Sequence, residues 1–326
     1  MTSSTRPTRI LSSNEPKFLR AFSLAIICLM LASSNLWGQE NKQYNVPIDN
    51  GSRVSSPTVV HHPKPDKWVT YKTIDGVELK LHCFQPEDHQ ANDQAAAIVF
   101  FFGGGWTGGD PKQFYGQARR LADCGMVAMT AEYRVHSRNQ TSPFECVKDG
   151  KSAIRWVRKN AKDLGIDSNR IIAAGGSAGG HVAACTATIS AMDEEGEDLS
   201  VSAVPNALIL FNPVLDTTAK GFGLSKVGED RQTEISPCHH VSSGVVPTLI
   251  FHGSADRTVP FENPKRFTKL MTEAGNICQL EEFEGEGHGF FNRGRSKYKP
   301  QPNEPSVYQK IQQETETFLK LHNFLD

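Results

Sequence analysis

The stretch RIIAAGGSAGGHVAA, residues 170–184, decides how the rest of the chain is interpreted. An apolar run leads into glycines around Ser177, and alanine-rich, helix-forming residues follow. The segment GGSAG at 175–179 matches the pattern G-x-S-x-G. In that pattern a serine occupies a sharp strand-to-helix turn, and the flanking glycines relieve its crowding. We therefore expect Ser177 to be a nucleophile exposed at the carboxyl edge of a sheet, where ligands bind in open α/β folds. A glycine turn with an incidental serine is the structural alternative.

Apolar runs of similar character recur along the chain, as expected for strands that are buried on both faces. They are AAAIVFFF (95–102), MVAMTA (126–131), RIIAAG (170–175), ALILFN (207–212) and TLIFHG (248–253). Helical segments are expected from Asp110-Pro111 onwards and at 143–161, 260–275 and 305–325. Apolar strands that alternate with helices predict a mostly parallel sheet covered on both faces.

The ordered part of the chain is expected to begin with an antiparallel pair. Residues 68–74 and 77–84 are joined by Asp75-Gly76, and the second segment alternates between apolar and polar side chains. A two-residue Asp-Gly link between two such segments is a strong hairpin signal. The predicted fold class is therefore α/β: a mostly parallel sheet with an antiparallel N-terminal hairpin and helices on both faces, in a single domain at 67–326.

The N-terminal region has the features of a secretory signal peptide. Four basic residues precede the short apolar segment AFSLAIICLMLA (21–32), and small and polar residues follow it. We expect residues 1–38 to be removed, residues 39–66 to form a polar, proline-rich linker, and the mature protein to be secreted or periplasmic. No stable membrane span is then expected after cleavage. An uncleaved membrane anchor is the alternative.

Composition excludes some partners. The chain has 326 residues, 38% hydrophobic and 22% charged, and a formal net charge of −1. No strong positive field is present to attract nucleic acid. The six cysteines outside the leader are scattered, without a CxxC pair or metal-ligand spacing, so buried free thiols are expected for most of them. Nothing in the sequence indicates the oligomeric state.

A serine hydroxyl needs a base to become nucleophilic. His288 lies in the glycine-rich segment GEGHGFF (285–291), directly after the expected strand CQLEEFE (278–284). A loop at a strand end can bring this imidazole to Ser177. Of the competitors, His252 ends a buried strand and suits a local structural hydrogen bond. The histidine pairs at 61–62 and 239–240 lie in polar segments.

The base in turn needs a carboxylate that orients it and stabilises its charged form. Asp256 follows the strand TLIFHG and is expected at the same sheet edge as Ser177. The chain order Ser177, Asp256, His288 is that of the hydrolase arrangement. Asp216 also follows a buried strand and is the alternative, in which case Asp256 only caps a turn.

The glycine-rich segment FFGGGWTGGD (101–110) follows another expected strand. Glycines let a backbone approach a ligand closely and direct N–H groups at it. Gly104 and Gly105, together with the N–H of Ala178, are candidates for an oxyanion hole. A phosphate-binding loop is a competing interpretation, but the segment lacks the Lys-Ser/Thr of a P-loop. A plain turn after a strand is the other.

These motifs together resemble the α/β-hydrolase family, and in particular its esterase/lipase branch with an H-G-G-G-W oxyanion loop, which includes acetylxylan-esterase-like and other carbohydrate-esterase members. The similarity covers residues 67–326 and rests on FGGGW (102–106), AEYR (131–134), VKDGKSAIRWVRKNA (147–161), GGSAGGHVA (175–183), FHGSADRTVP (251–260) and GEGHGF (285–290), in family order.

The resemblance implies roles and shows one departure. It implies Ser177 as nucleophile, His288 as base and Asp256 as the base's partner, with the oxyanion donors named above; Asp149 and Tyr133-Arg134 match structural positions. The histidine that braces the family's oxyanion loop is Phe102 here. Phenylalanine cannot make that histidine's hydrogen bond, which leaves the rigidity of the loop and its affinity for the oxyanion open, although the backbone donors remain.

The expected activity is that of a serine carboxylic-ester hydrolase that needs no metal or organic cofactor and acts through an acyl-enzyme. The connection at 217–247 is short and polar and contains no long amphipathic helix pair that could form an apolar lid. Short-chain esters are therefore the expected substrates, with acetyl esters of carbohydrate as candidates. The alternatives are a lipase, a prolyl-peptidase-like hydrolase and, in another class, a secreted non-catalytic binding protein. The Phe102 departure favours the binding protein, but the intact set of Ser177, Asp256 and His288 argues against it.

Overall fold

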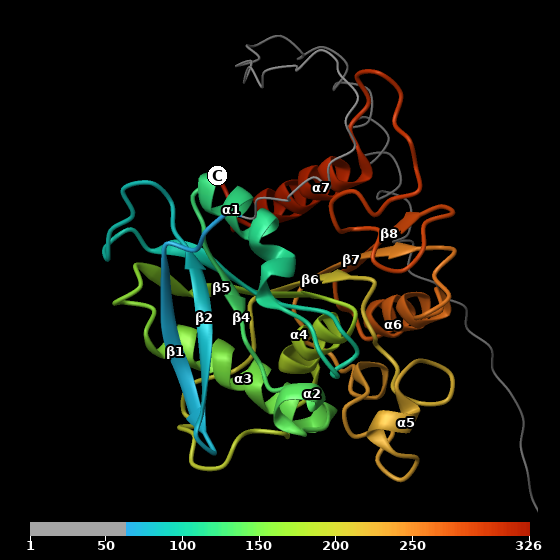
Figure 1. Cartoon of the computed structure of the whole chain (residues 1–326), viewed down its shortest axis with the longest axis horizontal. Coiled ribbons are helices and arrows are strands. Elements are labelled where there is room, and N and C mark those ends of the chain that lie inside the picture. Colours follow the sequence, from blue (N-terminus) through green and yellow to red (C-terminus); the bar gives the residue numbers. More distant parts are fainter. Residues whose placement is uncertain (1–62) are drawn as a thin grey trace, which may run out of the picture. The chain divides into compact units, whose positions relative to one another are not determined.

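A computed structural model describes residues 63–326, and the eight strands in this part of the chain form one sheet in the order β1-β2-β4-β3-β5-β6-β7-β8 (Figure 1). The strands are β1 (Lys67–Ile74), β2 (Val77–Phe84), β3 (Ala95–Phe101), β4 (Val127–Ala131), β5 (Ile166–Gly176), β6 (Ala207–Phe211), β7 (Thr248–Gly253) and β8 (Cys278–Phe283). All described residues belong to one compact unit. The predicted signal peptide and nearly all of the predicted linker lie outside the described residues.

The N-terminal hairpin and the parallel remainder of the sheet are both confirmed. β1 pairs antiparallel with β2, and β2 pairs antiparallel with β4, whereas all later pairs are parallel. The hairpin turn places Asp75 at φ 50° and Gly76 at φ 76°. Two successive positive φ values define the turn type that Asp-Gly favours, because its twist matches that of the flanking strands.

Helices cover both faces of the sheet, as predicted. They are α1 (Tyr115–Asp123), α2 (His136–Asn139), α3 (Pro143–Lys159), α4 (Ala178–Thr188), α5 (Leu224–Val227), α6 (Glu262–Glu273) and α7 (Val307–Leu321), with 3₁₀ turns η1 (Pro111–Phe114) and η2 (Pro237–His239). α1 and α7 pack on one face and α3, α4 and α6 on the other. Burial on both faces explains why the strand sequences are continuously apolar.

Alternate residues of β3 supply the two cores. Ile98 and Phe100 pack in the core beneath α1 and α7, whereas Ala97, Val99 and Phe101 pack in the core beneath α3, α4 and α6. The side chains of a strand point to opposite faces in turn, so one run of apolar residues serves both cores. The sheet is therefore a rigid platform for the loops at its edges.

The predicted helices form with small shifts at their ends. Asp110 accepts a hydrogen bond from the Lys112 N–H and caps η1, which leads directly into α1. Ser142 and Glu145 form a capping box at the start of α3, and Ser306 forms one at the start of α7. Capping boxes satisfy the unpaired N–H groups of a first helical turn, which fixes where these helices begin.

The cysteines of the described residues are all free thiols, which confirms the expectation. Four are buried and the other two, Cys124 and Cys278, are partly buried. Burial raises the pKa of Cys83 and Cys238 to about 12 and that of Cys278 to about 11. No helix within residues 63–326 is long and apolar enough to cross a membrane.

Candidate active site

Ser177 lies in strained backbone geometry directly between β5 and α4. Its φ is 53° and its ψ is −118°, which is rare for a residue with a side chain. Such a conformation costs roughly 1–3 kcal/mol and persists only where its surroundings hold it. Here the Ser177 N–H donates to the Phe211 carbonyl at 2.9 Å, and the Ser177 carbonyl accepts from the His181 N–H at 3.0 Å. The neighbouring strand and the new helix therefore hold the turn.

The glycines around Ser177 are required by close backbone contacts. A Cβ on Gly179 would lie 2.1 Å from the Phe101 carbonyl oxygen and 2.3 Å from that of Phe102. A Cβ on Gly175 would lie 2.4 Å from the Gly179 carbonyl oxygen. None of these three contacts is sterically possible, so the first turn of α4 can approach the end of β3 only with glycine at these positions.

The structure brings the hydroxyl, imidazole and carboxylate of the predicted site together. The Nε2 atom of His288 lies 2.9 Å from the Ser177 Oγ, and its Nδ1 lies 2.7 Å from the Asp256 Oδ2. Both distances are those of hydrogen bonds. Ser177 follows β5, Asp256 follows β7 and His288 follows β8, so all three lie at the carboxyl edge of the sheet.

Asp256 is held as a carboxylate. Its Oδ1 accepts the N–H groups of Thr258 and Val259 at 2.8 and 3.0 Å. Burial disfavours the charged form, but hydrogen bonds from His252, His288 and the Val259 N–H outweigh that effect and hold the pKa of Asp256 well below its usual range. A permanently charged Asp256 can therefore accept the Nδ1–H of His288 and direct its Nε2 at the serine.

The competing residues have other partners. The Asp216 carboxylate forms an ion pair with Arg266 and accepts the N–H and hydroxyl of Thr218. No hydrogen bond joins Asp216 to His288. The Nε2 of His252 donates to the Val259 carbonyl at 2.9 Å, which is the local structural bond expected for it.

The paired histidines also lie outside the arrangement. His239 bonds to the Ser236 hydroxyl at 2.8 Å and His240 to the Thr233 carbonyl at 2.9 Å. The pair at 61–62 lies outside the described residues. Among residues 63–326, no cluster of histidine, cysteine and acidic side chains is arranged to hold a metal ion.

The predicted oxyanion loop passes directly beside Ser177. A Cβ on Gly103 would lie 3.4 Å from the Ser177 Cβ. Gly104 and Gly105 have φ values of 134° and 60°, and a Cβ on Gly104 would lie 2.2 Å from the Gly108 carbonyl oxygen. Within residues 63–326, the N–H groups of Gly104, Gly105 and Ala178 donate to no protein acceptor. Free backbone donors of this kind suit a developing negative oxygen.

Phe102 braces the oxyanion loop by packing, at the position where the family has a histidine. The ring is buried and stacks on Tyr133, with centroids 4.1 Å apart and planes 16° from parallel. The Tyr133 hydroxyl donates to the Phe102 carbonyl at 2.6 Å, and the Arg138 guanidinium lies over the Phe102 ring. Phe102 occupies the position of the family histidine. Aromatic stacking on Tyr133 and one hydrogen bond from the Tyr133 hydroxyl to the Phe102 carbonyl hold it in place.

Trp106 and His181 connect the same loop to α4. The Trp106 indole N–H donates to the His181 Nδ1 at 3.3 Å, and the His181 Nε2–H donates to the Ile235 carbonyl at 2.6 Å. Burial lowers the pKa of His181 to about 4. The lowered pKa keeps the imidazole of His181 neutral. Only a neutral imidazole can accept the indole N–H of Trp106 at Nδ1. Both residues lie in the motifs FGGGW and GGHVA, but the motifs alone do not show that they meet.

Asn212 is a further site residue that the sequence analysis did not identify. It directly follows β6, is fully buried and has φ 35°. Its Oδ1 accepts the Gly289 N–H at 2.9 Å, next to His288, and its own N–H donates to the Phe251 carbonyl. In the sequence, the only signal for Asn212 was its place as a polar residue at the end of the apolar run ALILFN (207–212). Asn212 anchors the loop that carries His288.

Several known proteins are similar in sequence to this chain. The BD-FAE family model matches residues 81–271, which is more than half of the chain. Esterase LipC of Mycobacterium tuberculosis is 32% identical over 217 aligned residues, covering 60% of this chain and 53% of LipC. An acetylxylan esterase of Xylanibacter ruminicola is 27% identical over 240 residues, covering 69% of this chain and 46% of that protein. The chain therefore spans about half the length of these curated relatives.

Solved structures match a larger share of this chain and of their own length than these curated relatives do. The Thermogutta terrifontis esterase Est2, in its propionate-bound and butyrate-bound structures, is 45% identical to this chain with a TM-score of 0.73. Each match covers 79% of this chain and 95% of the Est2 chain. At this identity the likeness is one of sequence as well as of fold.

Proposed function

Because the chain belongs to the BD-FAE family of α/β-hydrolase esterases, we propose that it is a serine carboxylesterase whose nucleophile is Ser177. One observation carries the proposal. The Ser177 Oγ, the His288 imidazole and the Asp256 carboxylate form a continuous hydrogen-bonded line, with distances of 2.9 and 2.7 Å, beside unpaired backbone N–H groups.

Acylation follows from this geometry. His288 Nε2 takes the proton of the Ser177 hydroxyl while Oγ attacks the ester carbonyl carbon. The carbonyl oxygen becomes negative and accepts hydrogen bonds from the N–H groups of Gly104, Gly105 and Ala178. The imidazolium is stabilised by the charged Asp256. As the tetrahedral intermediate collapses, His288 gives its proton to the leaving alcohol, and an acyl-serine remains.

Deacylation uses the same groups in reverse. Water takes the place of the alcohol, His288 removes one of its protons, and the resulting hydroxide attacks the acyl carbonyl. The oxyanion again lies against the backbone donors. Collapse of the intermediate releases the carboxylic acid and returns the proton to the Ser177 Oγ. No step requires an electron donor or acceptor.

Short acyl groups are the proposed substrates. The connection between β6 and β7 contains only the four-residue helix α5 and the three-residue turn η2, so no long helix pair is available to cover a fatty chain. Est2 is found with propionate and with butyrate bound, and a relative is an acetylxylan esterase. These support short-chain esters as substrates, with acetyl esters of carbohydrate among them.

The decisive experiment is a chain-length series of p-nitrophenyl esters, from acetate to laurate, measured on the wild type and on Ser177→Ala. We expect kcat/KM to be highest for acetate to butyrate, and Ser177→Ala to lose hydrolysis. A preference for long chains would instead indicate a lipase. Cleavage of proline-containing peptide substrates without ester hydrolysis would indicate a peptidase.

Labelling separates the enzyme from a non-catalytic binding protein. We expect a fluorophosphonate probe to modify wild-type protein at Ser177 at neutral pH, and to leave Ser177→Ala unmodified. A folded wild-type protein that neither reacts with the probe nor hydrolyses any ester would support the binding protein.

Export is part of the same proposal and rests on the leader sequence at residues 1–38. We expect the mature protein to begin near residue 39 when the full chain is expressed in a secreting host. N-terminal sequencing of the exported protein tests this, and a full-length N-terminus in the membrane fraction would support an uncleaved anchor.

A further inference from the structure

Two carboxamide side chains connect the oxyanion loop to the loop that carries His288. The Gly103 N–H donates to the Gln113 Oε1 at 2.6 Å. The Gln113 Nε2–H donates to the Asn292 Oδ1 at 3.2 Å. The Asn292 Nδ2–H donates to the Gly289 carbonyl at 2.9 Å. These three bonds form an unbroken chain between a backbone N–H of the oxyanion loop and a backbone carbonyl of the loop that carries His288.

The direction of this chain is determined by its ends. A carboxamide has one acceptor oxygen and one donor nitrogen. Because the Gly103 N–H can only donate, it requires the oxygen of Gln113, which turns the nitrogen of Gln113 towards Asn292. Asn292 must then present its oxygen to Gln113 and its nitrogen to the Gly289 carbonyl, which can only accept. Each residue therefore has the donor and the acceptor that its place requires.

Both ends lie next to the proposed catalytic groups. Gly103 directly precedes Gly104, and a Cβ on it would lie 3.0 Å from the Gly176 carbonyl oxygen. Gly289 directly follows His288, and its N–H is held on the other side by the Oδ1 of Asn212. Asn292 and Asn212 thus bind the carbonyl and the N–H of the same glycine.

We propose that Gln113 and Asn292 act as a carboxamide relay that holds the oxyanion loop and the His288 loop in register with each other. They are positioning residues, since they act through Gly103 and Gly289. The proposal rests on the proposed hydrolase function. It goes beyond that function by naming the groups that keep the base and the oxyanion donors at a constant separation.

A relay of this kind affects the chemical step more than substrate binding. The tetrahedral oxyanion needs its donors and the base at defined positions at the same moment, and small displacements of either weaken transition-state stabilisation. We therefore expect kcat to fall while KM changes little. If the two residues act through one connection, breaking it at either point has the same consequence as breaking it at both.

The test is a double-mutant cycle with Gln113→Met, Asn292→Leu and the double variant, assayed with p-nitrophenyl acetate. Each substitution keeps the approximate size of the side chain and removes its hydrogen bonds. We expect each single variant to lower kcat about tenfold, and the double variant to be about tenfold rather than a hundredfold slower than the wild type. Losses that multiply in the double variant would overturn the relay.

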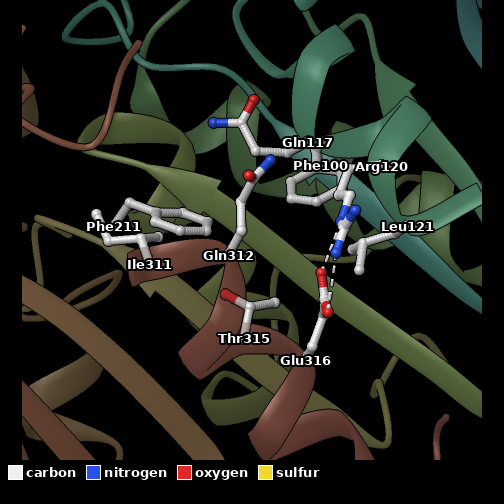
Figure 2. A pocket seen from close by; sticks show the side chains of 9 residues that line it. All are labelled: Phe100, Gln117, Arg120, Leu121, Phe211, Ile311, Gln312, Thr315 and Glu316. Atoms are coloured by element: carbon white, nitrogen blue, oxygen red, sulfur yellow. Dashed lines mark hydrogen bonds and ion pairs between the residues drawn. The ribbon is translucent and has the colours of Figure 1, made fainter. Parts of the chain in front are cut away.

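Gln312→Met is the matched control. Gln312 is a partly buried glutamine that lines a cavity of about 20 Å³ between α1 and α7, together with residues such as Phe100, Leu121 and Ile311 (Figure 2). The same chemical change there alters neither loop of the site. We expect its kcat and KM to equal those of the wild type.

Hydrogen exchange tests the relay without using activity. In Asn292→Leu, the peptide that contains Gly103 is expected to exchange its amide hydrogen faster than in the wild type, although Asn292 does not touch Gly103. Peptides from the β1-β2 hairpin and the melting temperature report any general loss of stability. Unchanged exchange at Gly103 would overturn the relay. If the wild type had no esterase activity, the proposed function would be contradicted. The exchange test of the relay would still be valid, because it does not depend on activity.

Discussion

The ring of Phe102 lies flat against the ring of Tyr133, and the Tyr133 hydroxyl donates to the carbonyl of the same phenylalanine. One tyrosine therefore holds both the side chain and the backbone of the residue that begins the oxyanion loop. Because the two contacts are made by different atoms, they can be removed separately.

Phe102→Leu removes the stacking and keeps an apolar side chain, whereas Tyr133→Phe keeps the stacking and removes the hydrogen bond. We expect Phe102→Leu to lower the free energy of unfolding by about 1–2 kcal/mol and kcat about tenfold, because the loop loses its packed support. Tyr133→Phe is expected to cost about 1 kcal/mol, since one buried carbonyl loses its donor. Urea denaturation and ester hydrolysis measure both. Wild-type kcat in Phe102→Leu would show that the stacking does not brace the loop.

Asp256→Asn distinguishes the two candidate carboxylates. An amide at 256 favours the wrong tautomer of His288 and cannot stabilise its charged form, so we expect kcat to fall about 10³- to 10⁴-fold while the protein stays folded. Asp216→Asn weakens the ion pair with Arg266 but leaves the contacts of His288 unchanged. Its kcat is expected within about threefold of the wild type, because the partners of the Asp216 carboxylate are Arg266 and Thr218 and not His288. The reverse ranking in p-nitrophenyl acetate assays would return Asp216 to the site.

His181 makes stability depend on pH. Burial lowers its pKa from 6.5 to about 4 in the folded protein, so between these values the unfolded chain binds a proton that the folded protein does not. The stabilising contribution is complete above pH 6.5 and is lost as pH falls towards 4. We expect the wild type to lose about 1.4 kcal/mol per pH unit more than His181→Gln over this range. Urea denaturation at a series of pH values measures it, and parallel curves for the two proteins would contradict the expectation.

Gly179→Ala tests the close approach of α4 to β3. The new methyl group would lie 2.1 Å from the Phe101 carbonyl oxygen, so either the helix or the oxyanion loop must move. We expect an insoluble protein, or a folded one with kcat lowered at least 100-fold because the nucleophile is displaced. Gly108→Ala is the control, since the nearest neighbour of the new methyl group would be the Ser137 hydroxyl at 3.7 Å, an ordinary contact. Circular dichroism and activity of the soluble fraction measure both, and a fully active Gly179→Ala would contradict the packing argument.

Local patterns were sufficient for the architecture. Continuous apolar runs identified the strands β3 to β7 of the parallel sheet, Asp75-Gly76 identified the hairpin, and the glycines around Ser177 identified the strand-to-helix turn. Each of these signals depends on residues that are neighbours in the chain. In the structure, the ends of the corresponding strands and turns lie within a few residues of the predicted ones. The order of serine, acid and histidine along hydrolase chains then limited the catalytic base and its carboxylate partner to a small number of candidates.

Contacts between distant loops depended on the tertiary structure. Gln113 and Asn292 are 179 positions apart, and His288 and Ser177 are 111 apart. Which of Asp216 and Asp256 meets His288, that Asn212 anchors Gly289, and that Phe102 finds Tyr133 all follow from the way in which successive loops converge at one sheet edge. The sequence by itself determined the strands, their flanking turns and the nucleophile, because periodicity and turn chemistry act over a few residues. Only the fold decided which side chains from separate loops touch, because those hydrogen bonds and ring contacts require positions within a few ångströms that no local pattern encodes.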